Sequence, residues 1–219
     1  MERFWQTVLT AVICIAVSLS VARPAPQESA VQGKGDYPII GLALGDSFSD
    51  IRARSTYKFK RTQLSKLDLV SVSTPAILHY IHTGCEFILP PALSVSPTID
   101  DLHATSVVAS PHLAYLGQEE ALKLASDLSE LFSKSNWVLS KQYLSLDQAK
   151  AIFDDSKTPS DNIIRIREWR CGDDELYLQI ERHWRQGEAL ARLAGAASDL
   201  YVVTVKIEND GVRAKYPGR

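Results

Sequence analysis

The sequence has few cysteines, no excess of charge of either sign, and little long hydrophobic sequence. Its 219 residues include three cysteines and one methionine, and 24 Lys and Arg residues balance 26 Asp and Glu residues, for a net charge of −2. Without a basic footprint the chain cannot displace counterions from nucleic acid, so we expect no nucleic-acid partner. A hydrophobic content of 45% and a charged content of 23% are ordinary for globular domains, which excludes a disordered or collagen-like chain.

The sequence motifs of familiar enzymes are also missing. There is no Gly-x-Ser-x-Gly elbow and no dinucleotide fingerprint, and the glycines of residues 41–47 lack the basic residue and the spacing of a phosphate loop. We therefore expect no cofactor and name no catalytic residue. Whether the chain is an enzyme stays open, with the balance against it.

The one long uncharged run lies at the N-terminus. Arg3 precedes residues 4–21, which carry no charge, and small residues follow at Ser20 and Ala22. This pattern predicts a secretory signal cleaved after Ala22. The run is also near the lower length limit for crossing a bilayer, so the alternatives are a retained signal-anchor in the inner membrane and, less in keeping with the Pro-rich segment that follows, a buried core helix. We expect a periplasmic or secreted protein, in contact with membrane only if residues 4–21 are uncleaved.

The cysteines fit an oxidising compartment. Cys14 lies in the predicted signal, which leaves Cys85 and Cys171 in the mature chain. Two thiols in an exported protein predict one disulfide between them. The alternative is a pair of unpaired, buried cysteines.

Hydrophobic patterning predicts an α+β fold in which short helices pack on antiparallel sheet. Residues 23–36 are rich in Pro, Gly and polar side chains and are expected to form a flexible tether. The folded part then divides into two α+β halves, 37–112 and 113–210, followed by a tail at 211–219. Whether the halves are two similar small subdomains is left open.

Individual elements differ in how clearly the sequence marks them. Residues 118–134 are the best amphipathic helix, and Ser145 with Gln148 forms a capping box that starts another. The strongest β signal is a hairpin of residues 163–170 and 175–184 around a turn. Further strands are expected at 67–73, 76–80, 85–89, 99–109 and 200–208.

His79, His82 and Cys85 have the one metal-like spacing in the chain. On a helix they would share a face and could bind zinc, but the flanking residues favour a strand, where residues 79 and 82 point to opposite faces. Cys85 is also needed for the disulfide. We therefore expect no metal site, and a nucleophilic Cys171 has no base within sequence reach.

Arginine and aromatic residues gather on the predicted hairpin. Exposed Arg mixed with Trp and Tyr is typical of protein-interface anchors. The alternative is ordinary cross-strand pairing with the glutamates of the same hairpin. The candidate binding residues are Arg165, Arg167, Trp169, Tyr177, Arg182 and Trp184.

Residues 40–51, Ile-Gly-Leu-Ala-Leu-Gly-Asp-Ser-Phe-Ser-Asp-Ile, carry a resemblance to known families. A short strand that ends in glycine and a Ser-capped helix resemble the opening of β-lactamase-inhibitor-like proteins and small outer-membrane assembly lipoproteins. The likeness covers about 12 residues, and the lipidation cysteine of those lipoproteins is missing. It implies a non-catalytic, protein-binding role, and no binding residue carries over.

These observations favour an exported, periplasmic protein-binding or inhibitory module whose partner is another protein, for example one that neutralises a secreted toxin or supports the envelope. One alternative is an exported metal-dependent hydrolase that uses His79, His82, Asp100 or His103. The other is a signal-anchored structural protein of the envelope.

Overall fold

The structure is a computed structural model, and it describes residues 36–59, 68–69, 75–155, 163–183 and 199–217. The predicted signal and nearly all of the predicted tether lie outside the described residues. The chain separates into a unit of residues 1–36 and a compact unit of Tyr37–Arg219. Among the described residues, no helix has both the length and the hydropathy needed to cross a membrane.

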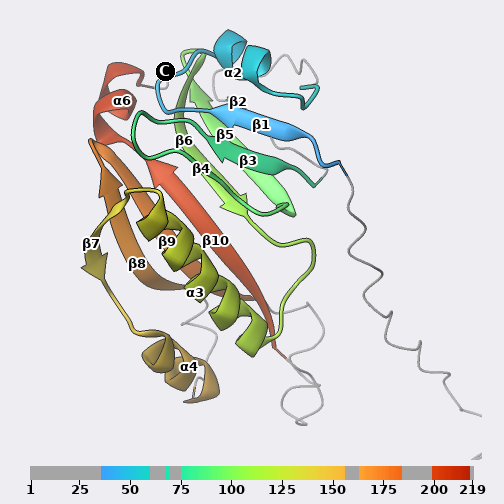
Figure 1. Ribbon diagram of the computed structural model, residues 1–219, viewed down its shortest axis with the longest axis vertical. Coiled ribbons are helices and arrows are strands. Elements are labelled where there is room, and N and C mark those ends of the chain that lie inside the picture. The colour runs from blue at the N-terminus through green and yellow to red at the C-terminus, as the bar shows by residue number, and fades with distance from the viewer. Residues whose placement is uncertain (1–35, 60–67, 70–74, 156–162, 184–198, 218–219) are drawn as a thin grey trace, which may run out of the picture. The chain divides into compact units, whose positions relative to one another are not determined.

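Two sheets form the compact unit (Figure 1), which confirms the predicted α+β class. The smaller sheet has the order β1-β3-β4, with β1 parallel to β3 and β3 antiparallel to β4. The larger is an antiparallel sheet with the order β2-β5-β6-β10-β9-β8-β7, so strands from both predicted halves share it. The strands are β1 Ile39–Leu42, β2 Asp68–Leu69, β3 Ile77–Tyr80, β4 Phe87–Ile88, β5 Ser94–Asp100, β6 His103–Ser110, β7 Val138–Gln142, β8 Ile163–Cys171, β9 Asp174–His183 and β10 Leu200–Glu208.

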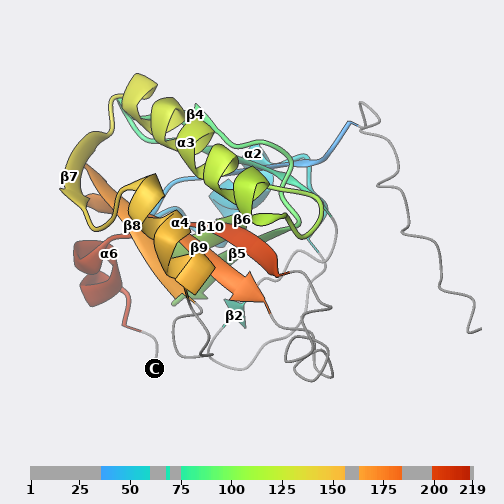
Figure 2. The same cartoon turned by 90° about the horizontal axis from the view of Figure 1, so that it is seen from below.

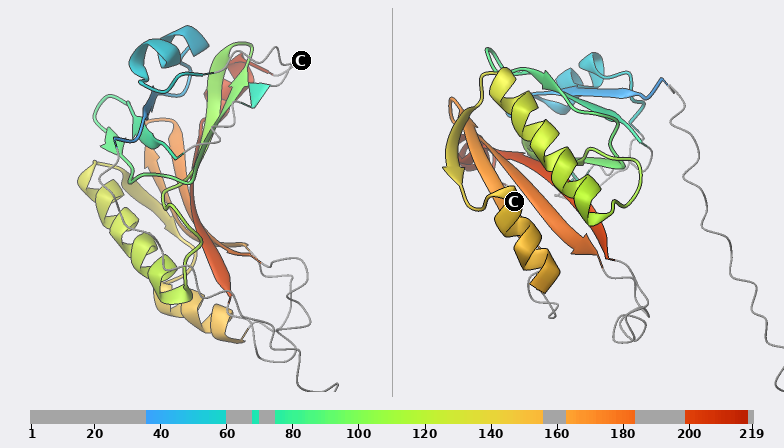
Figure 3. Two further views of the ribbon diagram at one scale, coloured as in Figure 1. Left: turned by 90° about the vertical axis from the view of Figure 1, so that its right-hand side faces the viewer. Right: turned by 60° about the horizontal axis from the view of Figure 1, so that its bottom comes forward.

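The described helices α2, α3 and α4 lie on the same side of the large sheet as the small sheet (Figures 1, 2 and 3). Helix α3 packs against β10, β9 and α4, and α4 also contacts β8. The short helix α6 lies beside β6 near the C-terminus. The helices are α2 Phe48–Arg54, α3 Gln118–Lys134, α4 Leu146–Asp155 and α6 Asp210–Lys215.

Local capping explains where several helices begin. Ser47 is the N-cap of α2 and accepts a bond from the Asp50 backbone N–H. The predicted capping box before α4 is present, because Gln148 N–H donates to Ser145 Oγ and Ser145 N–H to Gln148 Oε1. The residues expected to form a tail instead begin with a helix, α6, because Asn209 caps it through the Val212 N–H.

The segment predicted as one strand, 99–109, is instead the middle of a hairpin. Strands β5 and β6 meet at Asp101 and Leu102, which have φ values of 47° and 68°. Two consecutive left-handed residues reverse the chain between antiparallel strands, and Asn-Gly is the usual sequence for this turn. Asp101-Leu102 is not a usual sequence for this turn, so residue patterns alone do not predict it.

An aromatic cluster fills the space between the small sheet, α3 and β8. The ring of Phe87 lies 5.1 Å from that of Phe132, which in turn lies 5.3 Å from Trp169. Tyr80 stacks on Phe87, with ring centroids 5.5 Å apart, and Trp137 also packs against Phe87. The indole of Trp137 is held in place because its Nε1–H donates to Cys85 O. The two sheets therefore share one core and do not fold as separate cores.

His112 is a buried structural histidine. Its Nδ1–H donates to Ala114 O at 2.7 Å and its Nε2 accepts the Val203 N–H at 3.2 Å, which is the bonding pattern of a neutral ring. Burial lowers the pKa of His112 below its ordinary value.

This lowered pKa predicts a pH dependence of stability. The unfolded chain protonates His112 more readily than the folded protein, so stability is present above the unfolded pKa of about 6.5 and is lost as the pH falls below it. Denaturant unfolding between pH 8 and pH 5 should show this loss, and the His112→Gln variant should show a shallower dependence. An identical dependence in both proteins would contradict the assignment.

Candidate functional site

The predicted disulfide between Cys85 and Cys171 is confirmed. Their Cα atoms are 6.4 Å apart, and the bond joins residues 86 apart in sequence. Cys85 lies between β3 and β4 of the small sheet, and Cys171 ends β8 in the large sheet. The bond therefore links the two sheets covalently.

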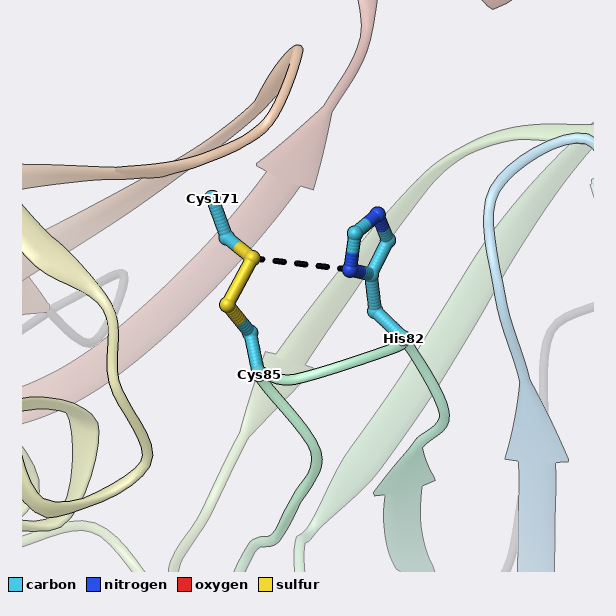
Figure 4. Close-up of side chains that lie close together, drawn as sticks. All are labelled: His82, Cys85 and Cys171. Carbon is cyan, nitrogen blue, oxygen red and sulfur yellow. Dashed lines mark hydrogen bonds between the residues drawn. A yellow bond between two sulfur atoms is a disulfide. The ribbon is translucent and has the colours of Figure 1, made fainter.

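His82 lies directly against this disulfide (Figure 4). Its Nδ1 is 3.4 Å from Cys171 Sγ, and its side chain remains 32% exposed. A tight turn sets this position, because Cys85 N–H donates to His82 O and Gly84 between them has a φ of +88°. A matching turn lies opposite, where Gly172 follows Cys171 with a φ of +58°. Glycine suits both positions because the left-handed region strains other residues.

The other ring nitrogen of His82, Nε2, lies near a buried carboxylate. Asp174 Oδ2 is 3.6 Å from His82 Nε2, and Asp174 is 3% exposed. The Tyr80 hydroxyl donates to Asp174 Oδ2 at 2.5 Å, and Asn209 Nδ2 donates to Oδ1 at 2.6 Å. Burial, together with the negative charge of Asp174, raises the pKa of Tyr80 far above its usual range, so Tyr80 stays a donor.

The sequence did not reveal this arrangement. It offered no base for Cys171, yet the fold brings one from 89 residues away. Among the described residues, the one group of three or more potential metal ligands is His82, Cys85 and Cys171, whose ligand atoms lie within 4.8 Å of one another. Once the disulfide is reduced, the imidazole is placed to take a proton from a thiol or to share a metal with the two sulfurs.

The remaining candidate ligands of the hydrolase alternative are dispersed. His79 on β3 pairs with Glu86, which directly precedes β4. Asp100 is buried and accepts the Thr105 hydroxyl at 2.6 Å. His103 Nδ1–H donates to Asp101 O, and its ring stacks on Tyr216 with ring centroids 3.9 Å apart. None of the three joins His82.

The six candidate binding residues do not form one surface. Trp169 and Arg182 are 1% and 2% exposed, because strand alternation and the contacts of Arg182 with α4 turn them inward. Arg167 is half-buried at a bulge of β8, where no described residue forms a hydrogen bond with its Nε. Trp184 lies outside the described residues. Arg165 and Tyr177 do meet, with the guanidinium 4.4 Å from the ring centroid.

Arg165 and Tyr177 belong to a polar array on the face of the large sheet opposite Trp169. The array runs across β7, β8, β9 and β10 in register, and its charges pair with one another. Arg170 Nη2, for example, is 2.6 Å from Glu175 Oε1. The polar array is defined here as Lys141, Tyr143, Arg165, Glu168, Arg170, Glu175, Tyr177 and Lys206.

Glu168 is the centre of the polar array. Its carboxylate accepts the Tyr143 hydroxyl at 2.7 Å and the Ser140 hydroxyl at 2.8 Å, and Arg170 lies nearby. The Tyr143 bond is the main cause of a lowered pKa for Glu168, opposed by burial and assisted by Ser140 and Arg170. Internal bonds therefore hold these side chains in place.

Strand β7 forms the edge of the large sheet next to the polar array. It pairs with β8, and all five of its residues are exposed. Val138 and Leu139 are 69% and 48% exposed, so the edge carries aliphatic side chains in solvent. Exposed edge strands present unpaired backbone groups that another strand can join. Residue patterns predict no strand here, because the run Val-Leu-Ser-Lys-Gln has no alternation.

Comparison of the chain with family models, with curated proteins and with solved structures finds no match.

Replacing Tyr80 by Phe should measure how firmly the buried carboxylate is held. The change removes a donor to a charged, buried acceptor, and we expect a loss of about 1.5–3 kcal/mol in the free energy of unfolding. Tyr57→Phe is the matched control, since no hydrogen bond of that hydroxyl is present among the described residues. Equal stabilities of the two variants would show that the Tyr80–Asp174 bond contributes nothing.

Proposed function

We propose that this chain is an exported protein-binding module that captures an extended segment of a partner protein along edge strand β7. The observation that carries the proposal is this edge, with its five exposed residues and two exposed aliphatic side chains. A partner strand would complete the backbone hydrogen bonds of β7 and cover Val138 and Leu139.

The polar array supports the same site. Its charged side chains lie beside the edge and are already fixed by mutual hydrogen bonds and ion pairs, so little side-chain entropy is lost when a partner contacts them. Lys141, exposed on β7, favours an acidic residue opposite it in the partner. Lysine at an edge also discourages indiscriminate pairing, which fits a selective binder.

Export is the second part of the proposal. The uncharged run at residues 4–21 is typical of a secretory signal, and a disulfide persists best in an oxidising compartment such as the periplasm. A protein outside the cytosol that recognises other proteins through a sheet edge and a braced polar surface fits an inhibitory or assembly role in the envelope.

Site-specific crosslinking tests the binding site. A photoreactive phenylalanine analogue at Leu139 of the full chain, produced in its native cell, should form an adduct with a discrete partner protein. Adding Val138→Lys should abolish the adduct, since a charge replaces the covered aliphatic surface. Ile88, 55% exposed on β4 of the other sheet, is the matched control position. Equal adducts at both positions, or none at Leu139, would refute the proposal.

N-terminal sequencing tests export. The mature protein recovered from the periplasm or medium should begin at Arg23. Full-length chain found among cytoplasmic contents would contradict it.

A further inference from the structure

We propose that, when the Cys85–Cys171 disulfide is reduced, the two thiolates and His82 Nδ1 bind one zinc ion. This inference uses no residue of β7, although β7 begins close to the cluster, where Val138 pairs with Arg170 next to Cys171. It rests on the geometry of the cluster in Figure 4.

The ligand spacing is close to that of a tetrahedral site. Zn–S bonds of about 2.3 Å and Zn–N bonds of about 2.0 Å at tetrahedral angles place sulfur and nitrogen about 3.5 Å apart. His82 Nδ1 and Cys171 Sγ are 3.4 Å apart in the oxidised protein. Two zinc-bound sulfurs lie about 3.8 Å apart, so reduction and a modest separation of the sulfurs complete the set.

The two turns make such a separation feasible without moving strands. Cys85 ends the turn that begins at His82, and Cys171 begins the β8–β9 turn, so each sulfur is carried by a turn and not by a strand interior. An alanine-sized group at Gly84 would meet no atom within 4 Å. Three protein ligands then leave a fourth position for water on the exposed side of His82.

Asp174 is placed to orient His82 as a zinc ligand. In zinc sites the ring nitrogen that does not bind the metal usually faces a carboxylate, which fixes the tautomer and strengthens the ligand. Asp174 Oδ2 lies 3.6 Å from His82 Nε2, and Tyr80 and Asn209 hold the carboxylate in place. Of the described residues, His82 is the one ion-pair partner of Asp174, so the carboxylate has no competing cation.

A thiol reductant opens the disulfide. Two equivalents of a thiol, or one dithiol, transfer two electrons and two protons to the S–S bond and leave as a disulfide. The protein then holds two thiols, which lose two protons when zinc binds as thiolate ligands. Zinc and the disulfide exclude one another, because the same sulfur atoms form both. The zinc form therefore belongs to the chain before oxidation or after reduction.

Zinc titration with a chromophoric chelator as competitor tests the site. Reduced protein should bind one equivalent, and oxidised protein none. His82→Ala should lower zinc affinity by about 10-fold or more, because replacing a residue that merely supports a metal ligand already lowers affinity by about 10-fold. His79→Ala is the matched control: it lies three residues away with a similar exposure, but pairs with Glu86, and it should bind zinc as the wild type does.

A second readout separates binding from loss of fold. Reduced protein with cobalt(II) should show the charge-transfer absorption of cobalt–thiolate bonds and the ligand-field bands of a tetrahedral site. Zinc should raise the thermal unfolding midpoint of the reduced wild type but not that of reduced His82→Ala. The proposal is overturned if reduced protein binds no zinc. It is equally overturned if His82→Ala binds as tightly as wild type, because two cysteines of an unfolded chain would then suffice.

Discussion

The structure depends on one junction, where a buried carboxylate and a disulfide bring two sheets together. Asp174 begins β9 and accepts bonds from Tyr80 at the end of β3 and from Asn209 at the start of α6. The Cys85–Cys171 bond lies beside it. Without this junction the small sheet would still pack on the large one through the aromatic cluster, and α6 would keep its cap and its contact with β6, but the bond from Asn209 to Asp174 would be lost. A buried ionised group held by neutral donors is costly to disturb, so the junction also fixes which strand ends meet.

The candidate site follows from the same junction. His82 is placed by a tight turn between Tyr80 and Cys85, and Cys171 and Asp174 flank the opposite turn. The histidine, the two sulfurs and the carboxylate therefore meet because two tight turns and the disulfide bring their positions together. The proposed binding edge β7 begins beside this site, where Val138 pairs with Arg170, but the two proposals use different residues and can fail separately.

Much of the fold could be predicted from residue patterns. The helix at 118–134, the capping box of Ser145 and Gln148, the β8–β9 hairpin and the disulfide rest on local periodicity, caps or cysteine count, and all four are confirmed. The β5–β6 turn and β7 could not be predicted, because Asp101-Leu102 lacks turn residues and β7 lacks alternation. Their conformations are imposed by pairing with neighbouring strands.

The site was harder to predict because its contacts span about 90 residues of sequence. Spacing alone linked His79 with His82, whereas the fold sends His79 to Glu86 and His82 to Cys171. Composition grouped Trp169 and Arg182 with Arg165, although alternation along the strands buries the first two. One available signal was the pair of glycines, Gly84 and Gly172, each beside a cysteine in a turn.

Denaturant unfolding of the oxidised protein and of the Cys85→Ala/Cys171→Ala double variant tests the central junction most directly. A cross-link that closes a loop of this length should contribute about 4–5 kcal/mol to the free energy of unfolding. The account predicts a loss of that order in the double variant and a reduced midpoint. Equal unfolding free energies, with two titratable thiols in the protein isolated without reductant, would contradict it.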